Sequence, residues 1–159
     1  MFLVGDKIVY PMHGAGVIEA IEERDILGEN RRYYVLRMPI GEMRVLVPVS
    51  HIPEGGLRLV IGAEEVGRVF EILGEDAGTE QENWNRRYRH NMEKLKSGDI
   101  FELAEVVRNL TRRDQRKGLS TGEKKMLDNA RQLLVSELVL AENATEESVA
   151  IQIKMCFAA

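Results

Sequence analysis

Two different periodicities divide the chain. Up to about residue 50, apolar and polar residues alternate in short runs that glycine and proline interrupt, a pattern typical of β-strands. Beyond about residue 62 the apolar positions recur every three or four residues, which is typical of amphipathic helices. The sequence therefore predicts an α+β protein, with a small antiparallel β-barrel followed by a compact all-helical domain of about five helices. The predicted boundaries are 1–55 for the β domain, 56–62 for a connector and 63–159 for the helical domain.

The predicted strands are short runs of β-branched and aromatic residues between turn-forming residues. Short strands with closely spaced turns favour a small antiparallel barrel. A β domain of this size has a thin core, so its function is expected on its surface. The predicted strands are 7–10, 17–22, 33–36 and 43–49, with breaks at 14–16, 28–30 and 40–42.

The helical half carries recognisable start and stop signals. Ser120 and Glu123 match a capping box that opens a long helix, and Thr145 is expected to cap a short last helix. Gly118 is expected just past the end of the preceding helix. The apolar stripes that predict the helices occupy 66–73, 84–95, 100–110, 127–141 and 149–153.

Charge is distributed unevenly along the chain. The formal net charge is −4, which by itself argues against a polyanionic partner. Residues 84–125, however, hold twelve Lys and Arg against six Asp and Glu, a local charge of +6, so the rest of the chain carries −10. Because salt screens charges beyond about 10 Å, the local charge decides what binds there. The basic middle can therefore meet phosphates while the acidic flanks keep the chain soluble.

Sequence patterns for catalysis and metal binding are missing. His13, His51 and His90 are scattered, and none stands at ligand spacing from Cys156 or a carboxylate. There is no nucleophile elbow, phosphate-binding glycine loop or HExxH pattern. We therefore expect no enzyme, metal, cofactor or small-molecule substrate. The lone cysteine and the lack of a long apolar run predict a cytoplasmic protein that does not enter a membrane.

The segment 83–90 combines the only tryptophan of the chain with three arginines. Trp84 stands in the first turn of a predicted helix, and Arg86, Arg87 and Arg89 follow it. Guanidinium groups match phosphate oxygens, and an indole can stack on bases or wedge into a distorted groove. The stripe that holds Trp84 also fits a core position, and spacing alone slightly favours burial. The first-turn position and the flanking asparagines favour the surface, so both interpretations stay open.

Two more basic clusters follow in the helical half. The run at 112–117 ends one predicted helix, where cations complement the helix dipole and need no partner. Lys124 and Lys125 begin the next helix, where the dipole disfavours cations, so an anionic partner would account for them. Three such clusters in one helical domain indicate a duplex-sized footprint.

Three stretches are similar to one known family: VGDKIVYPMHGAGVIEAIE, NWNRRYRHNMEKLKSGD and AEVVRNLTRRDQRKGLSTGEKKML. Over almost its whole length the chain resembles the CarD/CdnL family of bacterial transcription regulators. Its N-terminal part also resembles the RNA-polymerase-interacting module of the transcription-repair coupling factor. The resemblance implies a Tudor/SH3-like barrel that docks on the β subunit of RNA polymerase. It also implies a helical domain that contacts promoter DNA at the upstream edge of the bubble and stabilises the open complex.

The resemblance further implies roles for particular residues. Trp84 matches the family's minor-groove wedge, and the family's basic contacts fall on Arg89 and Lys124. A polymerase-docking arginine falls on Arg24, and Leu46 stands where some members have an arginine before the Val-Pro pair. The apolar edge at 45–48 suits strand pairing with a partner sheet. The predicted DNA-binding set, of little sequence specificity, is Trp84, Arg86, Arg87, Arg89, Lys124 and Lys125; the predicted docking set is Arg24, Arg44, Leu46 and Pro48.

Two other classes of function stay open at this stage. One is a pure protein–protein adaptor whose basic clusters contact acidic protein and not DNA. The other is a translation or RNA-binding factor with an SH3-like barrel, which depends only on the opening VGDKIVY. Contact with promoter DNA in the polymerase complex would exclude the first, and association with polymerase in place of ribosomes would exclude the second.

Overall fold

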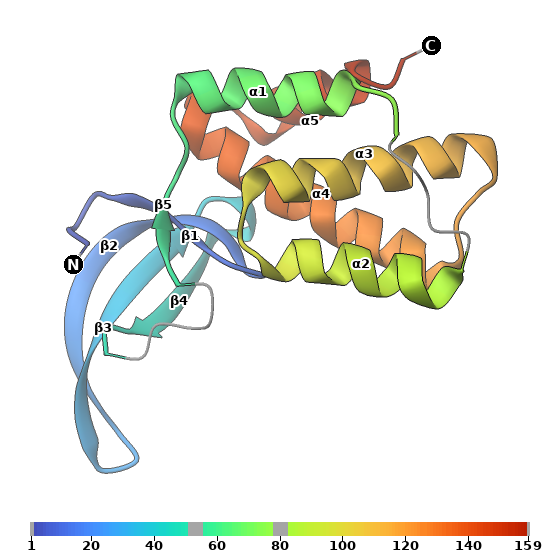
Figure 1. Cartoon of the computed structure of the whole chain (residues 1–159). Coiled ribbons are helices and arrows are strands. Elements are labelled where there is room, and N and C mark those ends of the chain that lie inside the picture. Colours follow the sequence, from blue (N-terminus) through green and yellow to red (C-terminus); the bar gives the residue numbers. More distant parts are fainter. Residues whose placement is uncertain (1, 51–55, 78–82, 159) are drawn as a thin grey trace.

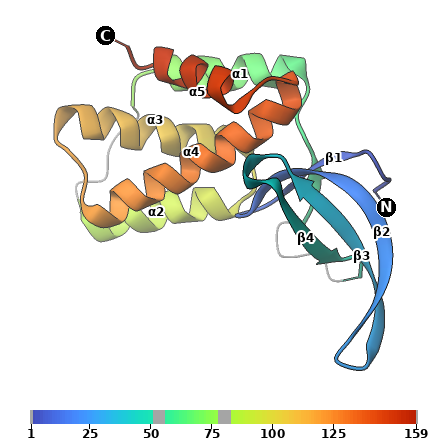
Figure 2. The ribbon, with the colours of Figure 1, turned by 180° about the vertical axis from the view of Figure 1, so that it is seen from behind.

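A β-sheet and a group of helices make up the two halves of the molecule (Figures 1 and 2). The computed structural model describes residues 2–50, 56–77 and 83–158. The predicted end of the β domain at residue 55 and His51 lie outside these ranges. No helix within them is long and apolar enough to cross a membrane. The α+β class, with strands first and five helices after them, is confirmed.

The five strands form one antiparallel sheet in the order β4-β3-β2-β1-β5. The sheet is open and not a closed barrel, because β4 and β5 are its edges and no described pairing joins them. β5 is two residues long and pairs only with β1, so it is too short to complete a ring. It lies inside the segment predicted as a connector. The strands are β1 (Lys7–Tyr10), β2 (Gly14–Ile26), β3 (Glu29–Met38), β4 (Met43–Pro48) and β5 (Arg58–Leu59), with a 3-10 turn at Ile40–Glu42 before β4.

Two strands are longer than their hydrophobic pattern predicts. β2 begins at Gly14, within the predicted break, because its glycines allow close backbone packing: a Cβ on Gly16 would lie 2.6 Å from the Met38 sulfur. At their other ends β2 and β3 continue as a polar hairpin through residues 23–32. This part is exposed on both faces, so no alternation marks it as a strand.

The pleat of the sheet separates an apolar face from a mixed face. Successive strand residues point to opposite faces, and directly paired residues share a face. The apolar face forms the small core that the sequence predicts for the β domain. Its buried members are Ile8, Ile18, Tyr34, Leu36, Met38 and Val47.

The predicted helix caps are confirmed. Ser120 accepts a hydrogen bond from the backbone N–H of Glu123, and Thr145 accepts one from that of Ser148. Gly118 follows the third helix with φ +78°, a left-handed conformation that glycine adopts at little cost. The helices are α1 (Ala63–Gly74), α2 (Trp84–Lys96), α3 (Ile100–Arg116), α4 (Thr121–Glu142) and α5 (Glu146–Met155).

α4 joins the two halves. The side chains of Arg58 and Glu137 form a two-bonded ion pair with N–O distances of 2.7 and 2.6 Å, and the Glu137 carboxylate is 2% exposed. Beside it, the Ser136 hydroxyl accepts a hydrogen bond of 3.0 Å from the backbone N–H of Ala15, and Lys7 Nζ donates to the carbonyl of Leu140. These contacts connect β1, β2 and β5 with one helix, so the sheet is anchored to the helices by more than its chain connection.

Candidate nucleic-acid interface

Trp84 is an exposed residue at the start of α2. Figure 1 shows that α2 begins at the end of the helical half that is farthest from the sheet. The Trp84 side chain is 41% exposed and does not belong to the helical core. Further along the same stripe, Tyr88 is half-buried and Leu95 is buried, so the stripe enters the core as α2 proceeds. Of the two interpretations that the spacing left open, the surface position is therefore the observed one.

Three contacts hold the indole of Trp84 in one orientation. Its ring stacks on Tyr88, with 4.9 Å between ring centroids and 20° between the planes. Its Nε1–H donates to the hydroxyl of Ser120 at 2.9 Å. A side-chain carbon on Gly122 would lie 3.6 Å from Cζ2 of the indole, so the ring rests on the first turn of α4. One face and edge are packed, and the remaining surface is open to a partner.

A buried ion pair stabilises the contact between α2 and α4 that holds the indole. Arg87 and Glu123 form two hydrogen bonds of 2.7 and 3.1 Å, and their side chains are only 9% and 2% exposed. The Glu123 carboxylate also accepts from the Ser120 hydroxyl. Burial opposes its charged form, but Arg87 and Ser120 outweigh burial, so the pKa of Glu123 is lowered. The pair joins the first turns of α2 and α4, which are the two turns that present Trp84.

Four of the predicted DNA-binding cations lie within the first two turns of α2 and α4, the helices that hold the indole. Their side chains are exposed, and none of the four forms an ion pair with any residue that the structure describes. Arg87 differs from them because it is buried against Glu123, so it supports the site and does not face a ligand. The four exposed cations are Arg86, Arg89, Lys124 and Lys125.

The basic run at 112–117 is divided between the interior and the surface. Arg112 is half-buried; its guanidinium lies 5.1 Å from the ring centre of Phe157, and its Nη2 donates to the carbonyl of Gly74. It therefore links α3 to the ends of α1 and α5. Arg116 and Lys117 are exposed at the end of α3.

Local sequence patterns do not reveal the residues that position Trp84. Ser120 and Glu123 were recognised only as a capping box, which predicts a helix start and nothing about a distant tryptophan. Their contact with α2 spans 36 residues of sequence, so no local pattern contains it. The one available signal was the run Arg86-Arg87, in which the second arginine faces inward by helical geometry.

The predicted polymerase-docking residues share the mixed face of the sheet. Arg44, Leu46 and Pro48 alternate along β4 and pair with Arg37, Val35 and Tyr33 of β3. Arg24 of β2 pairs with Arg31, which lies on that same face of β3. β4 is an edge strand, as strand pairing with a partner requires.

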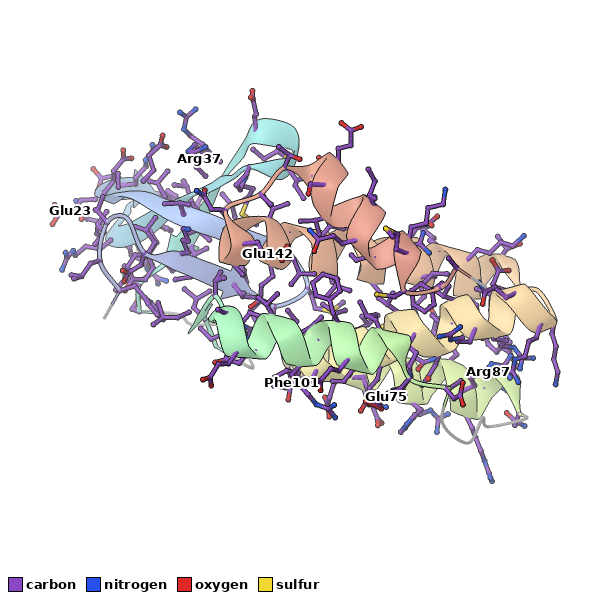
Figure 3. All side chains as sticks on the ribbon, turned by 90° about the horizontal axis from the view of Figure 1, so that it is seen from above. Glu23, Arg37, Glu75, Arg87, Phe101 and Glu142 are labelled. Atoms are coloured by element: carbon purple, nitrogen blue, oxygen red, sulfur yellow. The ribbon has the colours of Figure 1, made fainter. Side chains whose placement is uncertain are left out.

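The two arginines of the predicted docking set, Arg24 and Arg44, are paired within the protein. Arg44 binds Glu19 through two hydrogen bonds of 2.7 and 3.2 Å, which lower the pKa of Glu19. Arg24 binds Glu22 on its own strand at 2.7 Å. Figure 3 places Glu23 of the hairpin and Arg87 of α2 at opposite ends of the molecule. The two candidate surfaces are therefore separate.

The structure does not activate the single cysteine of the chain. Cys156 is half-buried at the end of α5, and burial raises the pKa of its thiol, so the reactive thiolate is disfavoured. Within residues 2–50, 56–77 and 83–158, no three His, Cys, Asp or Glu side chains are grouped closely enough to hold a metal ion.

Comparison with known proteins divides the chain where the fold does. Residues 2–61 match the CarD-like/TRCF RID domain, and residues 68–154 match the C-terminal domain of CarD. The chain is also 45% identical over 149 residues to the "Putative transcription factor YdeB" of Bacillus subtilis (strain 168), an alignment that covers 94% of this chain and 97% of that protein. With both halves matched in order, the chain belongs to the CarD family.

Proposed function

We propose that this protein is a transcription regulator that binds RNA polymerase through its sheet and promoter DNA through the first turns of α2 and α4. The polymerase contact is made with the β subunit, and the DNA contact lies at the upstream edge of the transcription bubble. The outcome is a stabilised open complex, in a cytoplasmic protein without an enzymatic step. The observation that carries the proposal is the exposed, fixed indole of Trp84 among four exposed cations.

The starts of α2 and α4, with Trp84 and the four exposed cations, form a surface that we call the α2–α4 tip. Its geometry suits distorted DNA better than intact duplex. Exposed cations attract phosphates without reading sequence. A flat apolar ring gains most where base stacking is already broken, as at the junction of duplex and single strands. Because stacking on Tyr88 and the Ser120 hydrogen bond already fix the ring, little side-chain entropy is lost on binding.

The sheet supports the polymerase half of the proposal. The N-terminal region of the chain, which forms the sheet, matches the CarD-like/TRCF RID domain. The docking candidates lie on one face of the sheet, beside the open edge of β4. Leu46 of β4 is 36% exposed on that face, which gives a protein partner apolar surface beside the strand edge.

Joining two modest contacts in one molecule explains the effect on initiation. A contact with polymerase raises the local concentration of the α2–α4 tip at promoters. A ligand that prefers open over closed DNA then shifts that equilibrium by its differential affinity and by no more. A preference of about 1.4 kcal/mol changes the equilibrium constant tenfold.

Trp84→Ala tests the DNA half directly. Aromatic stacking on a base contributes about 1 to 3 kcal/mol, so the variant should stabilise open complexes roughly fivefold to 150-fold less. The measurement is the lifetime of promoter complexes formed with RNA polymerase and the full chain. Met155→Ala is the matched control, since Met155 is also an exposed apolar side chain but lies at the end of α5.

Equal open-complex lifetimes with Trp84→Ala and with the unchanged protein would contradict the wedge role. Crosslinking from a photoreactive group at position 84 separates DNA contact from the adaptor alternative. Crosslinks to promoter DNA in the polymerase complex are expected. Crosslinks to protein alone would favour an adaptor whose cations contact acidic protein surface.

A further inference from the structure

The hairpin of β2 and β3 projects beyond the rest of the sheet. β4 ends at Pro48, opposite Tyr33, so the strand residues at 24–26 and 29–31 pair only with each other. Figures 1 and 2 both show this hairpin extending away from the helices. A two-stranded ribbon without a covering layer contributes little to a core, so its residues are free to serve another purpose.

The tip of the hairpin holds an apolar residue in a conformation that leucine disfavours. Ile26 and Glu29 are the last pair, and the two residues between them, Leu27 and Gly28, have φ values of +54° and +81°. Positive φ at both central residues is the requirement of a type I′ turn, where Asn-Gly or Gly-Gly is favoured. Glycine accepts this conformation readily, whereas leucine is strained in it.

No contact within the described residues compensates for leucine at this position. The Leu27 side chain is 99% exposed, so it packs against no part of its own fold, and the adjacent Ile26 is 42% exposed. Both the backbone conformation and the solvation therefore oppose Leu27 in the free protein. A leucine under these conditions is expected where a partner buries it.

We propose that Ile26 and Leu27 at the hairpin tip insert into an apolar hollow on RNA polymerase, next to the surface that the sheet face contacts. This inference depends on the polymerase contact of the proposed function and adds a second, sequence-distant anchor to it. Leu27 lies three residues from Arg24, about 10 Å along an extended strand. A partner surface that reaches Arg24 therefore also reaches the tip.

The charges of the hairpin favour protein over nucleic acid as the occupant. Residues 22–32 carry four acidic and three basic side chains, so the local charge is −1. Two of the three arginines are already paired, Arg24 with Glu22 and Arg31 with Glu29. An apolar wedge for DNA needs unpaired cations beside it to hold phosphates, as Trp84 has.

Leu27→Asn separates binding from folding. Asparagine is the preferred residue before glycine in this turn, so the variant should melt at the same temperature or about 2 to 4 °C higher. The affinity of the full chain for RNA polymerase should fall roughly tenfold, because a buried leucine is lost from the complex. Leu59→Asn is the matched control, since Leu59 is a 58% exposed leucine on β5, at the sheet edge opposite β4.

Each outcome decides between the alternatives. Unchanged polymerase affinity of Leu27→Asn, with the unchanged protein and Leu59→Asn also binding, would overturn the anchor while leaving the proposed function intact. Failure of the unchanged protein to bind polymerase would overturn both. A variant that loses self-association, or affinity for free promoter DNA, in place of polymerase affinity would assign the tip to another partner and refute the inference. A lower melting temperature together with weaker binding would show that the turn needs leucine to fold, which also refutes it.

Discussion

The sheet and the α2–α4 tip both display arginines, but the two regions use them differently. On the sheet, three of the five arginines of β2, β3 and β4 are neutralised by glutamates of the same surface: Arg24 by Glu22, Arg31 by Glu29 and Arg44 by Glu19. At the tip, the one neutralised arginine is buried, and the four exposed cations have no anionic partner among the described residues.

This difference indicates which kind of partner each surface suits. Unpaired cations gain from any polyanion, because neutralising phosphates releases their counterions. Exposed ion pairs contribute little to folding and can exchange partners, so they suit a protein surface that brings its own charges and apolar shape. Counting arginines would not distinguish the two regions; their pairing does.

The largest effect is expected from Glu123→Ala at the α2–α4 tip. Removing the carboxylate deprives the buried Arg87 guanidinium of its ion pair, which should lower the free energy of unfolding by about 3 to 5 kcal/mol. Urea unfolding, followed by circular dichroism and by the fluorescence of the single tryptophan, measures it. Glu123→Gln, which keeps an oxygen acceptor, should lose less. A change below about 1 kcal/mol for the alanine variant would mean that the buried pair is no more important than an exposed one.

Acid should act on the same group. Because the folded pKa of Glu123 lies below the ordinary value of 4.5, its contribution to stability is complete above that pH and is lost as pH falls towards the lowered value. Trp84 fluorescence should therefore change as the solution is acidified below about pH 4.5. Glu123→Gln should lack this part of the transition. An identical acid profile in the variant would assign the transition to other carboxylates.

A smaller effect, on binding and not on folding, is expected from replacing Arg89 and Lys124 together by alanine. Each phosphate contact contributes about one unit to the slope of log affinity against log salt, so the slope should decrease by about two. The measurement is the affinity of polymerase-bound protein for promoter DNA at several salt concentrations. Arg24→Ala is the control on the sheet and should leave the slope unchanged. An equal decrease in slope for Arg24→Ala would remove the distinction between the two surfaces.

The smallest effect is expected from Arg44→Ala on the sheet. Its pair with Glu19 is exposed, so the free energy of unfolding should hardly change. The pKa of Glu19 should rise towards its ordinary value, because the Arg44 hydrogen bond is the main cause of its lowering. Nuclear magnetic resonance titration of the Glu19 side chain measures the pKa, and urea unfolding measures the free energy of unfolding. A loss comparable to that of Glu123→Ala would show that exposure does not decide the strength of these pairs.

The sequence predicted most of the fold because its signals are local. The caps at Ser120 and Thr145, the stop at Gly118 and the change of period near residue 62 each depend on a few neighbouring residues. The length of the β2–β3 hairpin was not predictable in this way, since its outer residues bury neither face. The open sheet was not predictable either, because closure depends on whether the distant strands β4 and β5 meet.

For the candidate site, the sequence identified the residues that face outward and not those that hold them. Trp84 and the cations beside it are visible as a composition of aromatic and basic residues. Whether the indole is buried depends on where α4 begins in space, and the hydrogen bond to Ser120 joins residues 36 positions apart. Arg87 was predicted to contact DNA, but it is buried against Glu123. The sequence could not reveal this either, since Glu123 is equally distant in sequence.

The ion pair between Arg58 and Glu137 holds the sheet and the helices in a fixed relative position. A flexible tether would let the tip sample many positions along a promoter, whereas this two-bonded pair and the Ser136–Ala15 contact fix the angle of the sheet against α4. In the proposed complex, with the sheet on polymerase, the distance along the DNA from the enzyme to Trp84 is then fixed, at about 3.4 Å per base pair. Promoters would thus be distinguished by the position at which their DNA opens and not by the base sequence at that position.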